Sequence, residues 1–117
     1  MYVITSAEVL SFLADFKVKK SIWGVLYRDD RGKNAQTLAD LELRPLDRDA
    51  ILDGLEAEDY CQGPLEERLY GGSEMWVFGK EVKKNDIYIK VTLGVISAGV
   101  ICVSFHIAEH PLVYPFK

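Results

Sequence analysis

Two alternating runs near the carboxyl end, at positions 86–93 and 100–107, constrain the fold of this chain more than any other feature. Successive residues of a strand point to opposite faces, so each run has one apolar and one polar side. The apolar sides consist of Ile87, Ile89, Val91 and Leu93 in the first run and Ile101, Val103, Phe105 and Ile107 in the second. A slip of one residue would expose a whole apolar set, so the two runs predict a hairpin with a nearly fixed register.

The register that buries both apolar sides leaves a short connection from Gly94 to Gly99. It predicts four cross-strand pairs: Ile89 with Phe105, Val91 with Val103, Tyr88 with His106, and Lys90 with Ser104. A phenol, an ammonium group and an imidazole then converge on the uncovered side of a sheet, with Cys102 on the same side. These groups are sufficient for acid–base chemistry on a phosphodiester.

The first half of the chain carries helical signals. Thr5 and Glu8 have the spacing of a capping box, which predicts a helix that starts at Thr5 or Ser6 and fades into the basic segment 17–20. The apolar stripe of this helix consists of Val9, Leu10, Leu13 and Phe16. Further along we expect a strand at 22–27, a polar loop at 29–34, helices at 37–43 and 47–55, a loop at 61–73 and a strand at 74–82.

This order of elements predicts an α+β fold, in which N-terminal helices pack on a C-terminal antiparallel β-sheet. Pro45 is expected to end the helix at 37–43, because the residue before a proline is pushed out of the helical region. The segment 108–117 contains too many apolar residues to extend into solvent, so we expect it to pack back on the body.

The composition indicates one domain over residues 1–117, with 49% hydrophobic and 27% charged residues. A net charge of −4 is not typical of a nucleic-acid-binding protein. Four lysines on or between two adjacent predicted strands can nevertheless form a local basic face: Lys80, Lys83, Lys84 and Lys90.

The chain shows no apolar run long enough to cross a membrane, and its first residues lack the pattern of a signal peptide. Its two cysteines, Cys61 and Cys102, are far apart and do not form a disulfide framework. We therefore expect a reduced, cytoplasmic protein with no membrane contact. The sequence predicts no oligomeric state.

The order and spacing of several short motifs resemble the MqsR toxins, which are bacterial ribonucleases of type II toxin–antitoxin systems. The motifs are Leu55-x-x-x-Asp59-Tyr60, then Trp76, then Tyr88-x-Lys90, and then Val103-Ser104-Phe105. The likeness spans roughly residues 47–106, about half of the chain. It implies a RelE-like fold, sequence-selective cleavage of messenger RNA and neutralisation by a cognate antitoxin protein.

The resemblance places the family's tyrosine on the middle strand at Tyr88, and the lysine that closes its last strand at His106. The family's lysine after the Asp-Tyr segment falls on Gln62, and the glutamine after its tryptophan falls on Val77. Lys80 is a candidate to supply the polar group that Val77 lacks. Two of the four expected positions therefore differ in type.

Metal-independent cleavage of RNA requires a base for the 2′-hydroxyl, an acid for the leaving 5′-oxygen and a cation for the transition state. His106 is the candidate acid or base, since histidine alone titrates near neutral pH without perturbation. Tyr88 is expected to position the phosphate or to donate a proton. The predicted catalytic residues are thus His106, Tyr88 and Lys80, and the predicted substrate-binding residues are Lys90, Gln62 and Trp76. The expected product is a 2′,3′-cyclic phosphate, and the reaction requires no metal or other cofactor.

Several alternatives concern individual residues. Trp76 and Phe78 form an aromatic platform for an RNA base if they share the His106 face, and otherwise belong to the core. His106 and His110 are four residues apart, about 13 Å on an extended strand, which argues against a metal-binding pair. The same spacing separates Cys102 from His106 and argues against a thiol–imidazole pair.

Two other functions are compatible with the same residues. One is a catalytically silent protein on this scaffold that binds RNA or a partner protein, and the positions that differ from the family pattern support it. The other is a small structural domain whose polar strand face only meets solvent.

Overall fold

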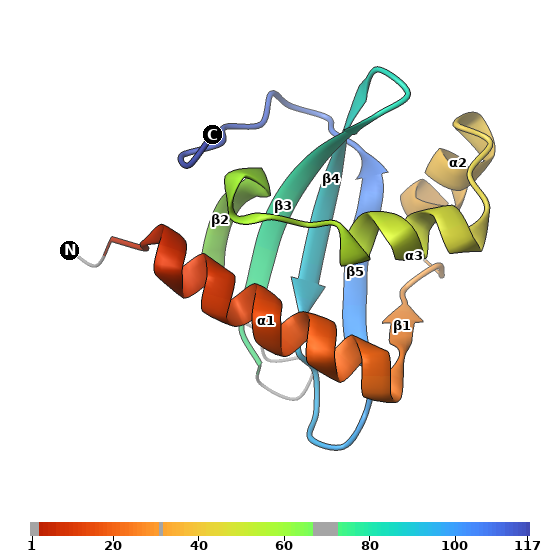
Figure 1. Ribbon diagram of the computed structural model, residues 1–117. Helices are drawn as coiled ribbons and strands as arrows, with labels where there is room; N and C mark the ends of the chain where they lie inside the picture. The colour runs from red at the N-terminus through yellow and green to blue at the C-terminus, as the bar shows by residue number, and fades with distance from the viewer. Residues whose placement is uncertain (1–2, 31, 67–72) are drawn as a thin grey trace.

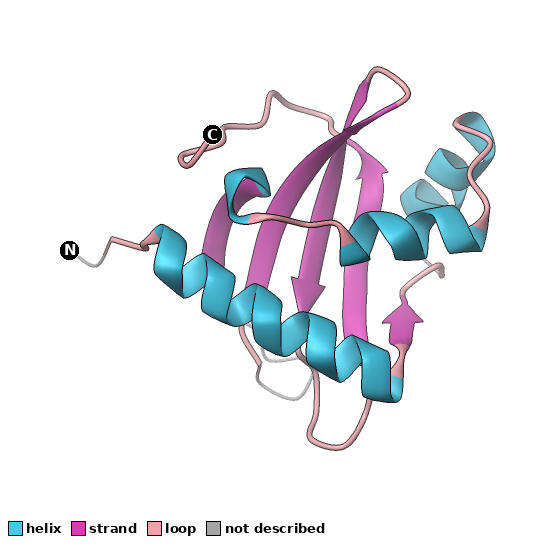
Figure 2. Ribbon diagram, viewed as in Figure 1, coloured by secondary structure: helices cyan, strands magenta, loops and turns pink. Residues whose placement is uncertain are grey.

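The computed structural model describes residues 3–30, 32–66 and 73–117 (Figure 1). Its helices are α1 (Ser6–Trp23), α2 (Gly32–Asp40) and α3 (Pro45–Asp53), followed by a 3₁₀ turn, η1 (Ala57–Asp59). Its strands are β1 (Val25–Tyr27), β2 (Tyr60–Leu65), β3 (Met75–Val82), β4 (Asn85–Thr92) and β5 (Val100–Ile107). They form one sheet in the order β1-β5-β4-β3-β2, with α1 and α3 across one face (Figure 2). The predicted α+β class, with helices first and strands last, is confirmed.

The sheet departs from the predicted antiparallel arrangement at both edges. β1 pairs with β5 in parallel, so the sheet is mixed. β2 occupies part of the segment 61–73, which the sequence predicts to be loop, and pairs antiparallel with β3. Gly63 and Pro64 are turn signals in a sequence, but a proline is tolerated in an edge strand, where no neighbour needs its missing N–H. The rest of the predicted loop lies partly outside the described residues.

Helix α1 begins as predicted and ends later than predicted. The Thr5 hydroxyl accepts a hydrogen bond from the Glu8 N–H, and the Glu8 carboxylate accepts one from the Thr5 N–H, each at 3.2 Å. The basic segment does not fray, because the ammonium groups of Lys17 and Lys20 bind acceptors in and after α3. The helix ends at Trp23 and is followed by Gly24, whose φ of 81° suits a residue without a side chain.

Helices α2 and α3 are shifted relative to the predicted ranges. α2 begins inside the predicted polar loop and ends at Asp40. Pro45, which was expected only to end the preceding helix, is the first residue of α3. A proline suits the first turn of a helix because the N–H it lacks would have no intrahelical acceptor there. The Arg44 N–H donates to the Asp47 carboxylate at 2.8 Å and completes this helix start.

The hairpin of β4 and β5 follows the predicted register over residues 88–90 and 104–106. Tyr88 pairs with His106, Ile89 with Phe105, and Lys90 with Ser104, as predicted. The next pair is Val91 with Cys102, so the predicted pair of Val91 with Val103 is wrong. Val103 is the extra residue of a β-bulge, which reverses the side to which the preceding residues of β5 point.

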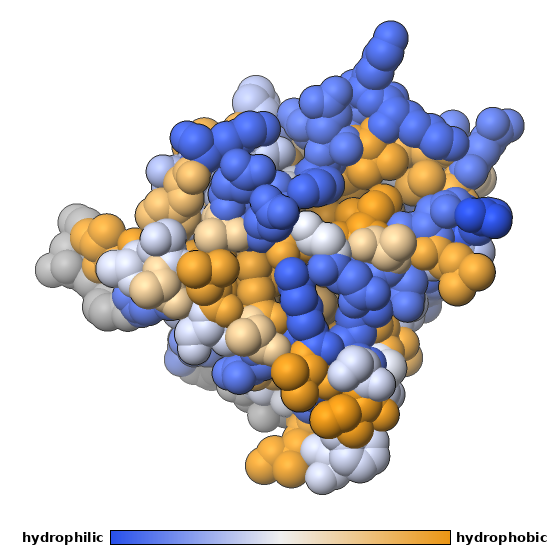
Figure 3. All heavy atoms as spheres, viewed as in Figure 1, coloured by the Kyte–Doolittle hydropathy of each residue, from blue (hydrophilic) through white to orange (hydrophobic). Residues whose placement is uncertain are grey.

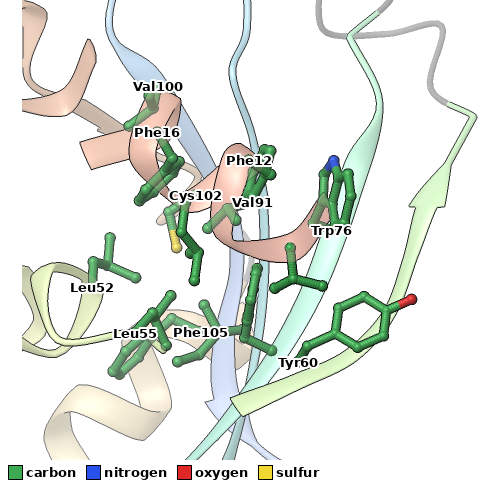
Figure 4. Packing of buried hydrophobic residues seen from close by; sticks show 14 of the residues in the cluster. Phe12, Phe16, Leu52, Leu55, Tyr60, Trp76, Val91, Val100, Cys102 and Phe105 are labelled. Atoms are coloured by element: carbon green, nitrogen blue, oxygen red, sulfur yellow. The ribbon is translucent and has the colours of Figure 1, made fainter. Parts of the chain in front are cut away.

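The bulge divides β5 between two apolar clusters. Cys102, predicted to lie on the polar side, is buried in the main core with Val91 and Phe105 (Figure 4). Ile101 and Val103, predicted to lie in that core, instead pack with Met75 in a smaller cluster. The apolar periodicity of β5 is therefore real, but it serves two faces of the sheet.

The main core lies between the sheet and the helices α1 and α3. Phe16, Phe78 and Phe105 are fully buried in it, and the Phe12 ring stacks on Trp76 with 4.6 Å between centroids. The C-terminal segment packs back on the body, as predicted: Phe116 contacts this core and lies 5.4 Å from the Tyr60 ring.

Side chains from α2 bind the backbone of β5 where β1 does not reach. β1 pairs with positions 100–102 only. Beyond it, the Asn34 amide donates to the Val103 carbonyl and accepts from the Phe105 N–H, both at 3.0 Å. The Thr37 hydroxyl accepts from the Ile107 N–H at 3.1 Å. Two side chains thus continue the hydrogen bonding that a longer β1 would supply, and they do so at the bulge.

The outer side of α1 carries exposed apolar side chains, including Leu10, Val18 and Ile22. Figure 3 shows such residues around α1 and at the lower end of the molecule, near the β4–β5 connection. Leu10 was predicted to face the core, and its exposure shows that the buried stripe runs through Phe12 instead. Among the described helices, none has the length and apolar character needed to cross a membrane.

Candidate active site

A pocket of about 540 Å³ lies on the side of the sheet away from α1, between the strands and the C-terminal segment. The strands contribute Cys61, Gln62, Val77, Tyr88, Lys90, Ser104 and His106, and the C-terminal segment contributes Glu109, His110, Pro111, Leu112 and Val113. Four of the six predicted site residues line this pocket, namely His106, Tyr88, Lys90 and Gln62.

The register of β4 and β5 determines the centre of the pocket. Tyr88 and His106 are directly opposite each other, and their rings stack with 5.3 Å between centroids at an interplanar angle of 20°. Lys90 follows on the same side of β4, with its Nζ atom 5.8 Å from the centroid of the Tyr88 ring. All three side chains are half-buried, so each has one surface held by the protein and another open to a ligand.

The hydrogen bond of His106 determines which ring nitrogen can take up a proton. Its Nδ1 atom lies 3.0 Å from the Ile107 carbonyl oxygen. A carbonyl oxygen only accepts hydrogen bonds, so Nδ1 must carry the proton in this contact. In the neutral ring Nε2 then has a lone pair, which is the arrangement that a general base requires.

The C-terminal segment forms the outer wall of the pocket because β3 has a glycine beneath it. A Cβ atom at Gly79 would lie only 2.6 Å from Leu112 Cδ1, and it would also clash with the Tyr114 ring. Gly79 is opposite Tyr88 in the sheet, so this close approach seats the segment beside the stacked rings. Leu112 and Val113 make this wall partly apolar, whereas Tyr88, Lys90 and His106 make the floor polar.

Glu109 brings a negative charge to the rim of the pocket. Its carboxylate lies 2.7 Å from the Lys33 ammonium of α2. This hydrogen bond and the charge of Lys33 lower the pKa of Glu109, and electrostatic interactions with His106 and His110 act in the same direction. A carboxylate is therefore held within electrostatic range of both imidazole rings.

Lys80 and Trp76 do not belong to this pocket, which corrects the prediction for both residues. Lys80 is opposite Ile87 and lies on the helix side of the sheet, where its Nζ atom is 3.0 Å from the Asp59 carboxylate. Trp76 is also on the helix side and is buried against Phe12. Both follow from alternation along β3, since positions 76 and 80 share one side and Val77 the other. Phe78 is also buried on the helix side, so the expected aromatic platform belongs to the core.

Neither cysteine offers an activated thiol. Burial raises the pKa of Cys102 to about 12, and the bulge turns this side chain away from the pocket. Cys61 lines the pocket, but burial and the nearby charges of Asp59 and Asp86 raise its pKa to about 11. Within the described residues, no group of three or more His, Cys, Asp and Glu side chains is arranged to hold a metal ion.

The C-terminal wall is the part of the site that the sequence analysis missed. The spacing of His110 from His106 argued only against a metal-binding pair, and it assumed an extended strand through 106–110. β5 ends at Ile107, and the chain bends at Glu109 and His110, which brings His110 back to the pocket that His106 lines. Pro111 was the available signal, because proline commonly follows the end of a regular element.

Comparisons with models of protein families, with curated proteins and with solved structures found no match to this chain.

Proposed function

We propose that this protein is a metal-independent endoribonuclease, which cleaves single-stranded RNA through attack by the 2′-hydroxyl of the RNA. The observation that carries the proposal is the setting of His106: its Nδ1 is committed to the Ile107 carbonyl, and the residue lines a pocket together with Tyr88 and Lys90. A base, a hydroxyl group and an ammonium group are the elements of this chemistry.

In this reaction His106 Nε2 removes the proton of the 2′-hydroxyl. The 2′-oxygen attacks the phosphorus, and the P–O5′ bond breaks to give a 2′,3′-cyclic phosphate and a 5′-hydroxyl. The Lys90 ammonium stabilises the charge that develops on the non-bridging oxygens. Tyr88 supports one side of the imidazole through ring stacking and offers its hydroxyl to the phosphate.

The shape of the pocket supports a single-stranded substrate. Its floor carries Lys90 and His106, while Leu112 and Val113 offer an apolar surface for a base or a sugar. A flipped or unpaired nucleotide can insert into such a pocket, whereas the stacked bases of a duplex cannot. Gln62 lies at the same pocket and supplies amide groups for hydrogen bonds to a base edge.

The cellular substrate and partner are part of the same proposal. We propose that messenger RNA is the substrate in the cytoplasm and that the protein acts as the toxin of a type II toxin–antitoxin pair. The motif order around Tyr88-x-Lys90 and Val103-Ser104-Phe105 supports this reading. Expression with and without the product of an adjacent small reading frame tests it, since only an antitoxin would relieve a growth arrest.

The direct test uses purified protein and a labelled RNA oligonucleotide in the presence of EDTA. We expect cleavage products that end in a 2′,3′-cyclic phosphate, and no cleavage of the matching DNA oligonucleotide. His106→Ala should lower the rate roughly 10²- to 10⁴-fold, the usual contribution of a general base. Lys84→Gln removes a charge from the β3–β4 turn, away from the pocket, and should leave the rate unchanged. Cleavage that needs a metal ion, or that survives His106→Ala, would contradict the mechanism.

A catalytically silent RNA-binding protein is the second candidate. The observation in its favour is the modest positive charge: among the described residues that line the pocket, Lys90 is the one lysine or arginine, since Lys80 is paired with Asp59 on the other side of the sheet. Saturable binding of RNA that Lys90→Gln weakens, together with no cleavage by the unmodified protein, would favour this second function.

A further inference from the structure

The two histidines of the chain line the same pocket, although they come from different structural segments. His106 lies within β5, and His110 lies beyond the end of that strand, in the bend that forms the outer wall. Four residues of continuous strand would have separated them by about 13 Å. β5 ends at Ile107, and the docking of Leu112 against Gly79 directs the chain back over the strands, so both histidines line the pocket.

The volume of the pocket suits a single phosphodiester. A sphere of the pocket's volume is about 10 Å across, and each proton transfer needs a heavy-atom distance of about 2.6–3.2 Å. A pocket of this size can hold one RNA phosphate within reach of two proton-transfer groups that line it. The strands supply one of these groups and the C-terminal segment supplies the other.

The surroundings of the two rings distinguish their tasks. His106 is half-buried, stacked on Tyr88 and fixed by the Ile107 carbonyl, which leaves Nε2 with a lone pair in the neutral ring. His110 is exposed, and its neighbour in the chain is the carboxylate of Glu109. Glu109 is held by Lys33 and interacts electrostatically with both imidazoles. The pocket is therefore lined by one imidazole with a free acceptor nitrogen and by a second imidazole next in the chain to a carboxylate.

We propose that His110 is a second catalytic residue, the general acid that protonates the leaving 5′-oxygen while His106 acts as the base. This inference rests on the proposed ribonuclease function and deepens it, because the reaction then needs no group from a ribosome or a partner protein.

The proposed step transfers two protons, and each has a donor and an acceptor. His106 Nε2 takes the proton of the 2′-hydroxyl as the bond from the 2′-oxygen to phosphorus forms. The P–O5′ bond breaks, and the imidazolium of His110 gives its proton to the 5′-oxygen. The products are the 2′,3′-cyclic phosphate and a 5′-hydroxyl, with His106 protonated and His110 neutral. Exchange of one proton at each ring with water restores the starting state.

The test compares two substrates that differ only in the leaving group. One is a ribodinucleotide, whose alkoxide leaving group needs an acid, and the other is uridine 3′-(4-nitrophenyl phosphate), whose nitrophenolate does not. We expect His110→Ala to lower kcat/KM roughly 10²-fold or more on the dinucleotide, and less than about fivefold on the nitrophenyl ester. His106→Ala should lower both rates, because both substrates need the base.

His110→Gln provides a second variant, which keeps hydrogen-bonding groups but cannot transfer a proton, and it should behave as His110→Ala does. Thermal unfolding of each variant verifies that the fold is intact. If the unmodified protein cleaves neither substrate, the proposed function fails. If it cleaves the dinucleotide and the His110 variants do so equally well, the function stands and the role of His110 is refuted. Equal losses on both substrates would also refute a general-acid role.

Discussion

Asn34 offers the sharpest test of how this fold supports its site, because one small side chain serves three backbone groups. Its Nδ2 atom donates to the carbonyls of Arg28 and Val103, and its Oδ1 atom accepts from the Phe105 N–H, all at 3.0 Å. The residue is only 2% exposed, so water does not readily replace these contacts. Asn34→Ala removes all three hydrogen bonds and leaves the edge of β5 unpaired at its bulge.

The expected cost follows from the number of groups left without partners. A buried polar group that loses its hydrogen bond costs about 1–3 kcal/mol, and neighbouring groups in one network do not add fully. Three such groups give an expected loss of about 3–5 kcal/mol in the free energy of unfolding. A domain of this size has a total stability of about 5–15 kcal/mol, so the variant should be close to the limit of folding at physiological temperature.

Urea unfolding followed by circular dichroism measures this loss, with Thr37→Val as the matched comparison. Thr37 lies on the same helix and accepts one hydrogen bond, from the Ile107 N–H, so its replacement should cost about 1–2 kcal/mol. A loss below about 1 kcal/mol for Asn34→Ala, or one no larger than that of Thr37→Val, would refute the view that α2 completes the edge of β5. It would indicate that solvent pairs these backbone groups equally well.

Two further predictions concern the pocket. Gly79→Ala should lower the free energy of unfolding by about 1–3 kcal/mol and raise hydrogen exchange across 109–116, because its methyl group would clash with Leu112. Gly32→Ala is the control, since an added Cβ there meets nothing within 4 Å. An equal effect of both substitutions would contradict the docking of the C-terminal segment on Gly79. At pH 8 iodoacetamide should alkylate Cys61 roughly 200-fold more slowly than free cysteine, because its pKa of about 11 leaves little thiolate, and mass spectrometry should show the rate rising with pH beyond 9. Alkylation at the rate of free cysteine would contradict the burial of this thiol.

The sequence patterns that were read correctly are those in which local periodicity and the fold agree. The capping box at Thr5 and the alternation in β4 and in positions 104–107 of β5 depend on neighbours within a few residues, and the structure has both. The wrong predictions arise where contacts with distant parts of the chain outweigh a local sequence signal. The lysines at the end of α1 suggest fraying, but acceptors in and after α3 hold Lys17 and Lys20. Pro64 suggests a loop, but an edge position tolerates it.

The site follows the same division. Tyr88 and His106 were correctly placed as partners, because the pleat of a strand has a period of two and one face had to be buried. For Lys80 the same alternation operates, but the position of α1 decides which side of β3 faces the core, and so Lys80 lies away from the pocket. The bulge at Val103 could not be predicted from alternation, since an extra residue breaks the period of two, and here the side chain of Asn34, distant in sequence, bonds the backbone groups of Val103 and Phe105.

By itself, the sequence determined that the chain has two amphipathic strands with Tyr88 and His106 on one side, because alternation is a property of consecutive residues. The tertiary structure alone decided what surrounds that pair. The docking of the segment after β5 on Gly79 brings His110 and Glu109 to the pocket, and the bulge sends Cys102 to the core. The physical reason is that aperiodic segments and register shifts gain their stability from contacts far apart in the chain, which no local pattern records.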